Sequence, residues 1–219
     1  MHEAGPEAGD AGAGGSLASG AGGSLARVRA EKAALRRELL RERGRIPADQ
    51  RAAAARLLRE EVLSLPEAQM AGTVAAYYSV GTEPDTRGLV YALWKHGAYV
   101  ILPLLRADGD LDWASYEGPG SMAEAPRGLL EPREPPRGPG AVARADFVIV
   151  PALAVDGRGM RLGRGGGGFD RALARVGPNV PVVALLHDGE LLDRLPAEPH
   201  DRPVRMAALP SRGVVRLRP

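Results

Sequence analysis

Apolar and polar positions change their spacing along this chain, and these changes predict alternating helices and strands. The charged stretch 25–43 predicts a first helix, which Gly44 is expected to end. Pro47 is expected to open a second helix that runs to about Ser64, because the first turn of a helix does not need the N–H that proline lacks.

The rest of the chain continues this alternation. Asp85 or Thr86 can cap a third helix that ends at Gly97, and a fourth helix is expected over 169–176. Apolar and β-prone segments predict strands over 73–78, 99–104, 111–116, 146–155, 180–186 and 204–217, the last range holding one or two strands. The stretch 146–155 is the most apolar of these, which favours a buried strand.

Strands separated by helices are typical of an α/β fold. We therefore expect a single domain with a largely parallel central sheet and helices on both faces. A chain of 219 residues, 44% of them hydrophobic, can bury the core of such a domain. Proline and glycine are frequent over 117–140, which predicts a long loop or flap. Ligands of such sheets bind at the carboxyl ends of the strands.

The first residues have a different composition from the rest. Residues 1–24 are mostly Gly, Ala and Ser and predict a disordered tail, which leaves 25–219 as the folded domain. They lack the basic and apolar regions of a signal peptide. No apolar run approaches the length of about eighteen residues that suggests a membrane-spanning helix. We therefore expect a cytoplasmic protein with no membrane partner.

Composition and charge exclude several kinds of site. The chain has no cysteine, so it has no disulfide, no thiolate zinc site and no cysteine nucleophile. Its lysines are Lys32 and Lys95 alone, so arginine supplies nearly all of its 29 basic residues. The net charge of +2 is spread along the chain and no aromatic platform accompanies it. We expect no nucleic-acid partner, whereas an anionic small molecule suits this charge.

The most informative segment is R-L-G-R-G-G-G-G-F-D-R at 161–171. Its glycines are Gly163, Gly165, Gly166, Gly167 and Gly168. Such a run lets the backbone approach a ligand, and its free N–H groups, with a helix beginning just after them, can cradle an anion. Arg161 and Arg164 can fork onto phosphate oxygens, and Asp170 is a hard oxygen ligand that suits Mg²⁺. The segment predicts a loop that binds a nucleoside triphosphate with its metal.

Other interpretations of the glycine run stay open at this point. It could be a plain flexible loop, and it is not a Walker A motif because no Gly-Lys-Ser/Thr follows. It also contains G-x-G-x-x-G, with Asp188 about twenty residues farther on, as in a dinucleotide-binding fold. That match is weak because a run of glycines satisfies many patterns.

Three other places carry candidate chemistry. Lys32 and Arg36 lie four apart on the first predicted helix, where they either contact a ligand or form a solvated basic face. Glu83 follows a predicted strand and is either a site carboxylate or an exposed loop acid. Asp201 is either a second metal-binding carboxylate or a turn residue. The four histidines show no ligand spacing, and we interpret each as structural or exposed.

The order of these motifs resembles the 5-formyltetrahydrofolate cyclo-ligase family. The strongest match is 146–173, where an apolar strand is followed by Pro, an Asp before a Gly, and then R-L-G-x-G-x-G and an Asp. Weaker matches occur in the family's order: K-A-A-L-R at 32–36, the strand that precedes Glu83, G-L-L-E-P at 128–132, and H-D at 200–201. The resemblance covers about residues 27–210.

This resemblance implies an enzyme, a monomer, that closes 5-formyltetrahydrofolate to 5,10-methenyltetrahydrofolate at the expense of ATP. The implied ATP-binding residues are Lys32, Arg36, Arg161, Arg164, Gly165, Gly166, Gly167, Gly168 and Phe169. The implied substrate-binding residues are Tyr78, Glu83, Arg164 and Gly168. Asp170 and Asp201 match the family's Mg²⁺ carboxylates.

The chain departs from the family pattern at a few positions. Gly168 stands where the family has the first of two aromatic residues, and Arg205 stands where it often has an aspartate. The family's acid is usually followed by Thr two positions downstream, where this chain has Pro84 and Asp85 between Glu83 and Thr86. Two alternatives therefore remain. One is a nucleotide-binding regulatory or RNA-associated module on the same fold, and the other is a dinucleotide-dependent oxidoreductase that uses Asp188.

Overall fold

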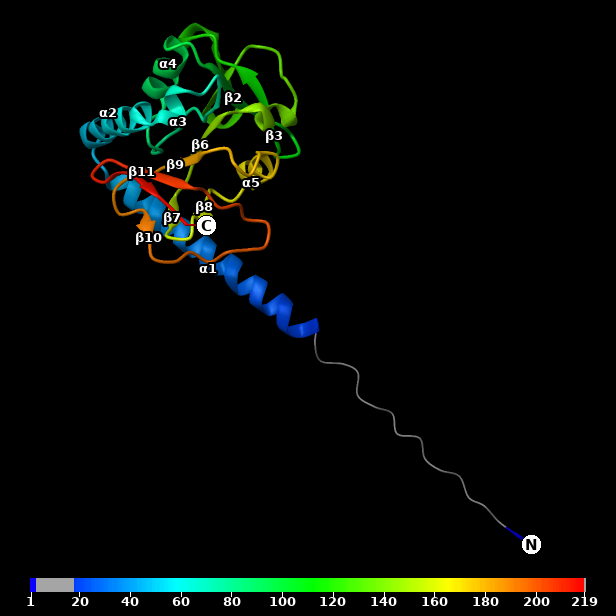
Figure 1. Cartoon of the computed structure of the whole chain (residues 1–219). Helices are drawn as coiled ribbons and strands as arrows, with labels where there is room; N and C mark the ends of the chain where they lie inside the picture. Colours follow the sequence, from blue (N-terminus) through cyan, green and yellow to red (C-terminus); the bar gives the residue numbers. More distant parts are fainter. Residues whose placement is uncertain (3–17, 219) are drawn as a thin grey trace.

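The computed structural model describes residues 1–2 and 18–218 (Figure 1). Its central sheet consists of β1 Thr73–Ala75, β2 Tyr99–Leu105, β3 Leu111–Ser115, β6 Phe147–Pro151, β9 Val182–Leu185, β11 Met206–Leu209 and β12 Gly213–Arg216. The strands lie in the order β12-β11-β9-β6-β1-β2-β3. Neighbours pair in parallel except at the two edges, where β3 and β12 pair antiparallel. The predicted fold class is therefore confirmed.

The middle of this sheet is built from residues that suit a strand buried on both faces. β6 reads F-V-I-V-P, and its first four residues are buried. β1 lies between β2 and β6, with Val74 opposite Val100 on one side and Phe147 on the other. β-branched and aromatic side chains favour such positions, because they pack well against neighbours on a pleated surface.

Helices cover both faces of the sheet, as expected. On one face lie α2 Ala48–Ser64, α3 Pro66–Gln69 and α4 Arg87–Lys95. Leu58 and Val62 of α2 and Leu89 and Leu93 of α4 are buried in the same cluster. On the other face, α5 Gly168–Leu173 and a 3₁₀ helix, Pro139–Arg144, pack against a second cluster. Figure 1 shows α2 and α4 on one side and α5 on the other.

The first helix, α1, is longer than the sequence predicted. It spans Ala18–Arg45, so residues 18–24 are helical where a disordered tail was expected, and residues 3–17 of that tail lie outside the described residues. Extending a helix costs less than starting one, because each added residue gains a hydrogen bond. The N-terminal part of α1 projects away from the body (Figure 1). Within the described part of the chain, no helix combines the length and the apolar character needed to cross a membrane.

A second, three-stranded sheet packs against α1. Its strands are β7 Ala154–Asp156, β8 Arg161–Leu162 and β10 Leu191–Leu192, in the order β10-β7-β8. Leu39 of α1 is buried against Leu153, Leu162 and Leu195. This small core fixes the C-terminal half of α1 beside the glycine-rich loop, which follows β8 directly.

Two predicted elements are wrong in detail. The strand predicted over 146–155 is two strands in different sheets, because the chain leaves the central sheet after Pro151 and joins the small one at Ala154. The range 117–140, predicted to be a loop or flap, contains an antiparallel pair, β4 Met122–Ala125 and β5 Leu129–Pro132. Of the two predicted caps, Thr86 precedes α4 but its hydroxyl donates to the carbonyl of Tyr77, whereas Oδ1 of Asp85 accepts the N–H of Arg87, the first residue of α4, at 2.9 Å.

Candidate active site

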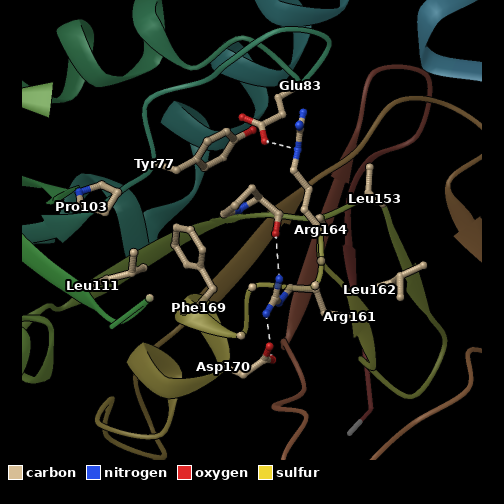
Figure 2. Close-up of a pocket in the computed structure, with 18 of the residues that line it drawn as sticks. Tyr77, Glu83, Pro103, Leu111, Leu153, Arg161, Leu162, Arg164, Phe169 and Asp170 are labelled. Carbon is tan, nitrogen blue, oxygen red and sulfur yellow. Dashed lines mark hydrogen bonds and ion pairs between the residues drawn. The ribbon is translucent and has the colours of Figure 1, made fainter. Parts of the chain in front are cut away.

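A cavity of about 690 Å³ opens at the carboxyl ends of the central strands. Glu83 reaches it from the segment after β1, Pro103 from β2, and Leu153 from the segment after β6. Figure 2 shows these side chains around one space, with the glycine-rich loop along its wall. The position agrees with the expectation for parallel sheets, because the loops at this edge converge where the strands end.

Every residue that the family resemblance implies as a site residue lines this cavity. These residues are Lys32, Arg36, Tyr78, Glu83, Arg161, Arg164, Gly165, Gly166, Gly167, Gly168, Phe169, Asp170 and Asp201. They come from α1, from the segment after β1, from β8, α5 and the loop between them, and from the segment after β10. The fold thus brings together groups separated by most of the chain.

The glycine-rich loop is held by its carbonyl groups. Arg36 of α1 donates from Nε to the carbonyl of Gly163 at 2.8 Å, and Arg171 of α5 donates from Nη2 to that of Gly166 at 3.1 Å. In the described part of the chain, no hydrogen bond uses a backbone N–H of residues 164–167 as its donor. The loop is therefore fixed while these N–H groups stay available to an anion.

Two glycines of this loop have backbones that favour glycine. Gly165 has a φ of +102° and Gly167, which precedes α5, has a φ of +69°. A β-carbon on Gly167 would also lie 2.9 Å from Nη1 of Arg171. A side chain at either position would strain the loop, because left-handed backbone places Cβ too close to the following carbonyl.

The buried side chain of Arg161 connects the end of β6 with α5, beside the glycine-rich loop. Its side chain is only 2% exposed, and it donates to the carbonyl of Pro151 at 3.1 Å and to Oδ1 of Asp170 at 2.8 Å. Its Nε is buried without a partner among the described residues. A buried guanidinium needs a carboxylate nearby, so Asp170 neutralises Arg161 and joins the strand end to α5 (Figure 2).

Glu83 and Arg164 form an ion pair at the wall of the cavity (Figure 2). Nε of Arg164 lies 3.1 Å from Oε1 of Glu83, whose Oε2 accepts the N–H of Val80 at 2.9 Å. Glu83 is 9% exposed, so the interpretation of Glu83 as an exposed loop acid is wrong. Arg164 is half-exposed, which leaves it free to exchange the carboxylate for a ligand.

Tyrosines close the side of the cavity next to Glu83. Tyr77 is buried and donates its hydroxyl to the carbonyl of Pro84 at 2.9 Å. Burial, and then the negative charge of Glu83, raise the pKa of Tyr77 well above its usual value, so the hydroxyl stays protonated. Tyr78 is half-buried and packs against Tyr116, with ring centroids 6.4 Å apart. The sequence indicated Tyr78 but not Tyr77 as a cavity residue.

Lys32 lies in a cluster of carboxylates at the other end of the cavity. Its Nζ is 2.5 Å from Oδ2 of Asp201 and 3.0 Å from Oε2 of Glu198. Lys32 is 3% exposed, so the interpretation of this residue as part of a solvated basic face is wrong. Hydrogen bonds from Arg29 first, and then from Lys32, lower the pKa of Glu198 to about 2. This carboxylate is therefore ionised at neutral pH.

The carboxylates at this end fit a Mg²⁺ ion by their chemistry. Among the described residues, both hydrogen bonds to the carboxylate of Asp170, from Arg161 and from the N–H of Arg202, end on Oδ1, which leaves Oδ2 for another ligand. Glu198, His200 and Asp201 offer ligand atoms that lie within 4.8 Å of one another. Hard cations such as Mg²⁺ take carboxylate oxygens of this kind.

Several cavity residues were not foreseen from the sequence. Arg29 lies one helical turn before Lys32 on α1, and Glu198 and His200 shortly precede the predicted Asp201. The motif E-P-H-D at 198–201 could have indicated Glu198 and His200, since it places three ligand types within four residues. Leu129 and Leu130 line the cavity from β5; the family match G-L-L-E-P at 128–132 includes them, but the sequence did not assign them to the site.

Asp188, which a dinucleotide-dependent oxidoreductase would use, lies outside the cavity. Oδ1 of Asp188 accepts the N–H and hydroxyl of Ser211 at 3.1 and 2.7 Å, and Asp188 does not line the cavity. The geometry therefore gives no support to a dinucleotide site that would use Asp188 to hold a ribose. Arg205, which replaces a family aspartate, donates to the carbonyl of Pro178.

Comparisons with known proteins agree with this geometry. The model of the 5-formyltetrahydrofolate cyclo-ligase family matches residues 28–210. A protein of Mycolicibacterium smegmatis named 5-formyltetrahydrofolate cyclo-ligase is 41% identical over 193 residues, which cover 85% of this chain and 97% of the relative. A protein of the same name from Escherichia coli is 33% identical over 154 residues, or 69% of this chain and 85% of the relative.

Solved structures share the fold. The NMR structure of a 5,10-methenyltetrahydrofolate synthetase from Aquifex aeolicus superposes with a TM-score of 0.74 at 28% identity, covering 86% of this chain and 93% of that one. A second synthetase, from Mycoplasma pneumoniae, has a TM-score of 0.64 at 18% identity and supports the fold alone. From the extent of the family match and the identity of these relatives, the chain belongs to the 5-formyltetrahydrofolate cyclo-ligase family.

Proposed function

We propose that this protein uses ATP to convert 5-formyltetrahydrofolate to 5,10-methenyltetrahydrofolate, with release of ADP and phosphate. The observation that carries the proposal is that one cavity combines the Glu83–Arg164 pair with the N–H groups of residues 164–167, which have no hydrogen-bond partner in the described part of the chain. The N–H groups suit a phosphate chain, and the pair suits a ring system that offers N–H donors. Membership of the family supports the same reaction.

The oxygen of the formyl group is a poor leaving group, and the reaction requires that it be converted to a phosphate, which leaves readily. The formyl oxygen attacks the γ-phosphorus of ATP, and the bond from that phosphorus to ADP breaks. N10 of the folate then attacks the formyl carbon and loses its proton. The carbon–oxygen bond breaks as phosphate leaves, and the methenyl bridge remains between N5 and N10. No step needs a nucleophile from the protein, so catalysis depends on positioning and on neutralising charge.

The polar end of the cavity provides groups for the ATP phosphates. The N–H groups of residues 164–167 are available for phosphate oxygens, and Arg36 holds the loop at Gly163 while it faces the same space. Lys32 adds a buried positive charge nearby. In this assignment Arg161 does not contact phosphate directly, because its guanidinium is already bonded to Pro151 and Asp170.

Mg²⁺ would be held by Asp170 and Asp201 and would neutralise negative charge on the phosphates. Asp201 is paired with Lys32, so a cation at this carboxylate would weaken that ion pair. Lys32 would then be available to a phosphate oxygen while Glu198 keeps its side chain in place.

The other end of the cavity suits the folate. Glu83 accepts hydrogen bonds from ring N–H groups of the pterin, and Tyr78, Phe169 and Leu111 provide apolar surface for the rings. Arg164 pairs with Glu83 and is half-exposed, so its guanidinium would be able to turn toward the phosphorylated formyl group. This places Arg164 where negative charge develops, between ATP and folate.

The test is a comparison of two ligands on one variant. Glu83→Gln is expected to weaken binding of 5-formyltetrahydrofolate by about tenfold to a hundredfold, as for a lost hydrogen bond to a charged group. Calorimetry should show unchanged binding of Mg·ATP. Glu60→Gln, an exposed glutamate of α2, is the control. If Glu83→Gln binds the folate like the unmodified protein, the assignment of the folate end is wrong.

A further inference from the structure

We propose that His187, Glu190 and Arg43 form a buried positioning network that holds the turn bearing Glu83, and thereby sets the affinity of the cavity for the folate. The proposal deepens the proposed function and rests on its folate site. None of the three residues is assigned to bind ATP, folate or metal above. All three are buried, with exposures of 3% for His187, 5% for Glu190 and 1% for Arg43.

The turn itself is compact. Glu83 donates its N–H to the carbonyl of Val80 at 3.2 Å, and Val80 donates its N–H to Oε2 of Glu83 at 2.9 Å. Gly81 has a φ of +61°, which permits the reversal between them. The carboxylate of Glu83 is thus tied to its own turn, so any displacement of the turn moves the carboxylate relative to Arg164.

His187 holds this turn from outside. Nε2 of His187 lies 3.1 Å from the carbonyl oxygen of Thr82, the residue before Glu83. A carbonyl only accepts hydrogen bonds, so Nε2 carries a proton and donates it. Burial lowers the pKa of His187, Glu190 and the Thr82 carbonyl oppose that effect, and Arg43 and Arg51 add to it. The neutral ring with its proton on Nε2 satisfies the contact.

Glu190 and Arg43 fix His187 in turn. Oε2 of Glu190 accepts the backbone N–H of His187 at 2.8 Å, and the carboxylate forms a two-point ion pair with Arg43 at 2.6 and 2.7 Å. Nη2 of Arg43 also donates to the carbonyl of Ala152 at 2.5 Å. A bidentate arginine has a defined orientation, so it transmits position more rigidly than a single contact does.

The network therefore connects parts of the chain that build both ends of the cavity. Arg43 comes from α1, which also carries Lys32 and Arg36, and Ala152 follows β6. His187 follows β9, and its partner Thr82 precedes Glu83. Because every member is buried and bonded, the turn has one preferred position when the ligand arrives. Because the turn is already ordered, binding of the folate costs less conformational entropy, which raises the affinity.

His187→Phe and His187→Gln separate positioning from packing. Phenylalanine fills the space but cannot donate to Thr82, whereas glutamine carries an amide N–H that can replace Nε2. We expect His187→Phe to raise the dissociation constant for 5-formyltetrahydrofolate about tenfold, the effect of one lost hydrogen bond. His187→Gln should restore most of that affinity, and binding of Mg·ATP should be unchanged in both variants. If His187→Phe does not fold, the smaller His187→Leu replaces it.

A double-mutant cycle with Glu83→Gln tests whether His187 acts through Glu83. If it does, the effect of His187→Phe on folate affinity shrinks when Glu83→Gln is already present, because the two changes remove the same interaction. Thermal unfolding of each variant separates this effect from a general loss of stability. Unchanged folate affinity in His187→Phe, or effects that simply add, would overturn the network. Absence of folate binding by the unmodified protein would instead overturn the proposed function, and the network with it.

Discussion

Nε of Arg36 lies 2.8 Å from the carbonyl oxygen of Gly163, a contact between residues 127 positions apart. A helix near the start of the chain thus holds the glycine-rich loop near its end. The bond uses a carbonyl, so the N–H groups of residues 164–167 keep no partner among the residues that the structure describes, and the same guanidinium lines the cavity. One side chain both shapes the loop and adds positive charge to it.

Arg36→Ala should therefore weaken binding of Mg·ATP by about tenfold to a hundredfold, since a hydrogen bond from a charged group is lost. Folate affinity should change little. Arg37→Ala is the matched control, because Arg37 is exposed and does not line the cavity. Calorimetric titration with each ligand measures both effects. Equal affinity for ATP in the two variants would exclude Arg36 from the phosphate site.

Gly167→Ala should disturb the loop through its backbone. The φ of +69° and the 2.9 Å approach to Arg171 both oppose a β-carbon there, so we expect a loss of about 1–2 kcal/mol in unfolding free energy and weaker ATP binding. Gly166→Ala is the control, because a β-carbon at Gly166 meets nothing within 4 Å. Denaturant unfolding of both variants tests the difference, and equal stability would argue against a loop constrained at Gly167.

Asp170→Asn should affect both stability and metal dependence. Arg161 would lose the charge that balances its buried guanidinium, which lowers the unfolding free energy by about 1–3 kcal/mol. The half-saturating Mg²⁺ concentration should also rise, because an amide binds a hard cation less well than a carboxylate does. Asp188→Asn, outside the cavity, should do neither. If Asp170→Asn lowers the stability but leaves the Mg²⁺ dependence unchanged, Asp170 pairs with Arg161 and does not bind the metal.

Glu198 should make stability depend on pH in the acidic range. Its pKa falls from an ordinary 4.5 to about 2 in the folded protein, so the unfolded chain binds the proton more readily between these values. The stabilisation from Glu198 is fully present above pH 4.5 and is lost as the pH falls toward 2. Unfolding free energies of Glu198→Gln and the unmodified protein should therefore differ at neutral pH and converge in acid. A difference that is constant with pH would contradict this ion pair.

The sequence predicted the central architecture because its signals are local. The apolar run that includes β6 and the proline before α2 act through neighbouring residues, and both were placed correctly. The end of β6 was missed, because the chain leaves the sheet through contacts with residues far away. Leu153 donates its N–H to Leu162, and Ala152 is held by Arg43.

The site was predictable where a motif is contiguous. The loop 161–171 and Asp170 could be recognised from spacing alone, and the family resemblance added Lys32 and Glu83, for which local patterns favoured exposed positions. The bonds from Lys32 to Glu198 and Asp201 join residues that are 166 and 169 positions apart, so no local sequence pattern predicts these bonds. The hairpin β4–β5 was missed because M-A-E-A and L-L-E-P are weak strand sequences among prolines and glycines.

The most direct test of the account is the near-ultraviolet absorbance of the methenyl product, followed in purified protein with 5-formyltetrahydrofolate, ATP and Mg²⁺. Each component is omitted in turn, and ADP is measured in parallel. We predict that absorbance rises only when all three are present, with one ADP formed for each product molecule. Binding of ATP without any rise would contradict the cyclo-ligase function and would indicate a nucleotide-binding module on the same fold.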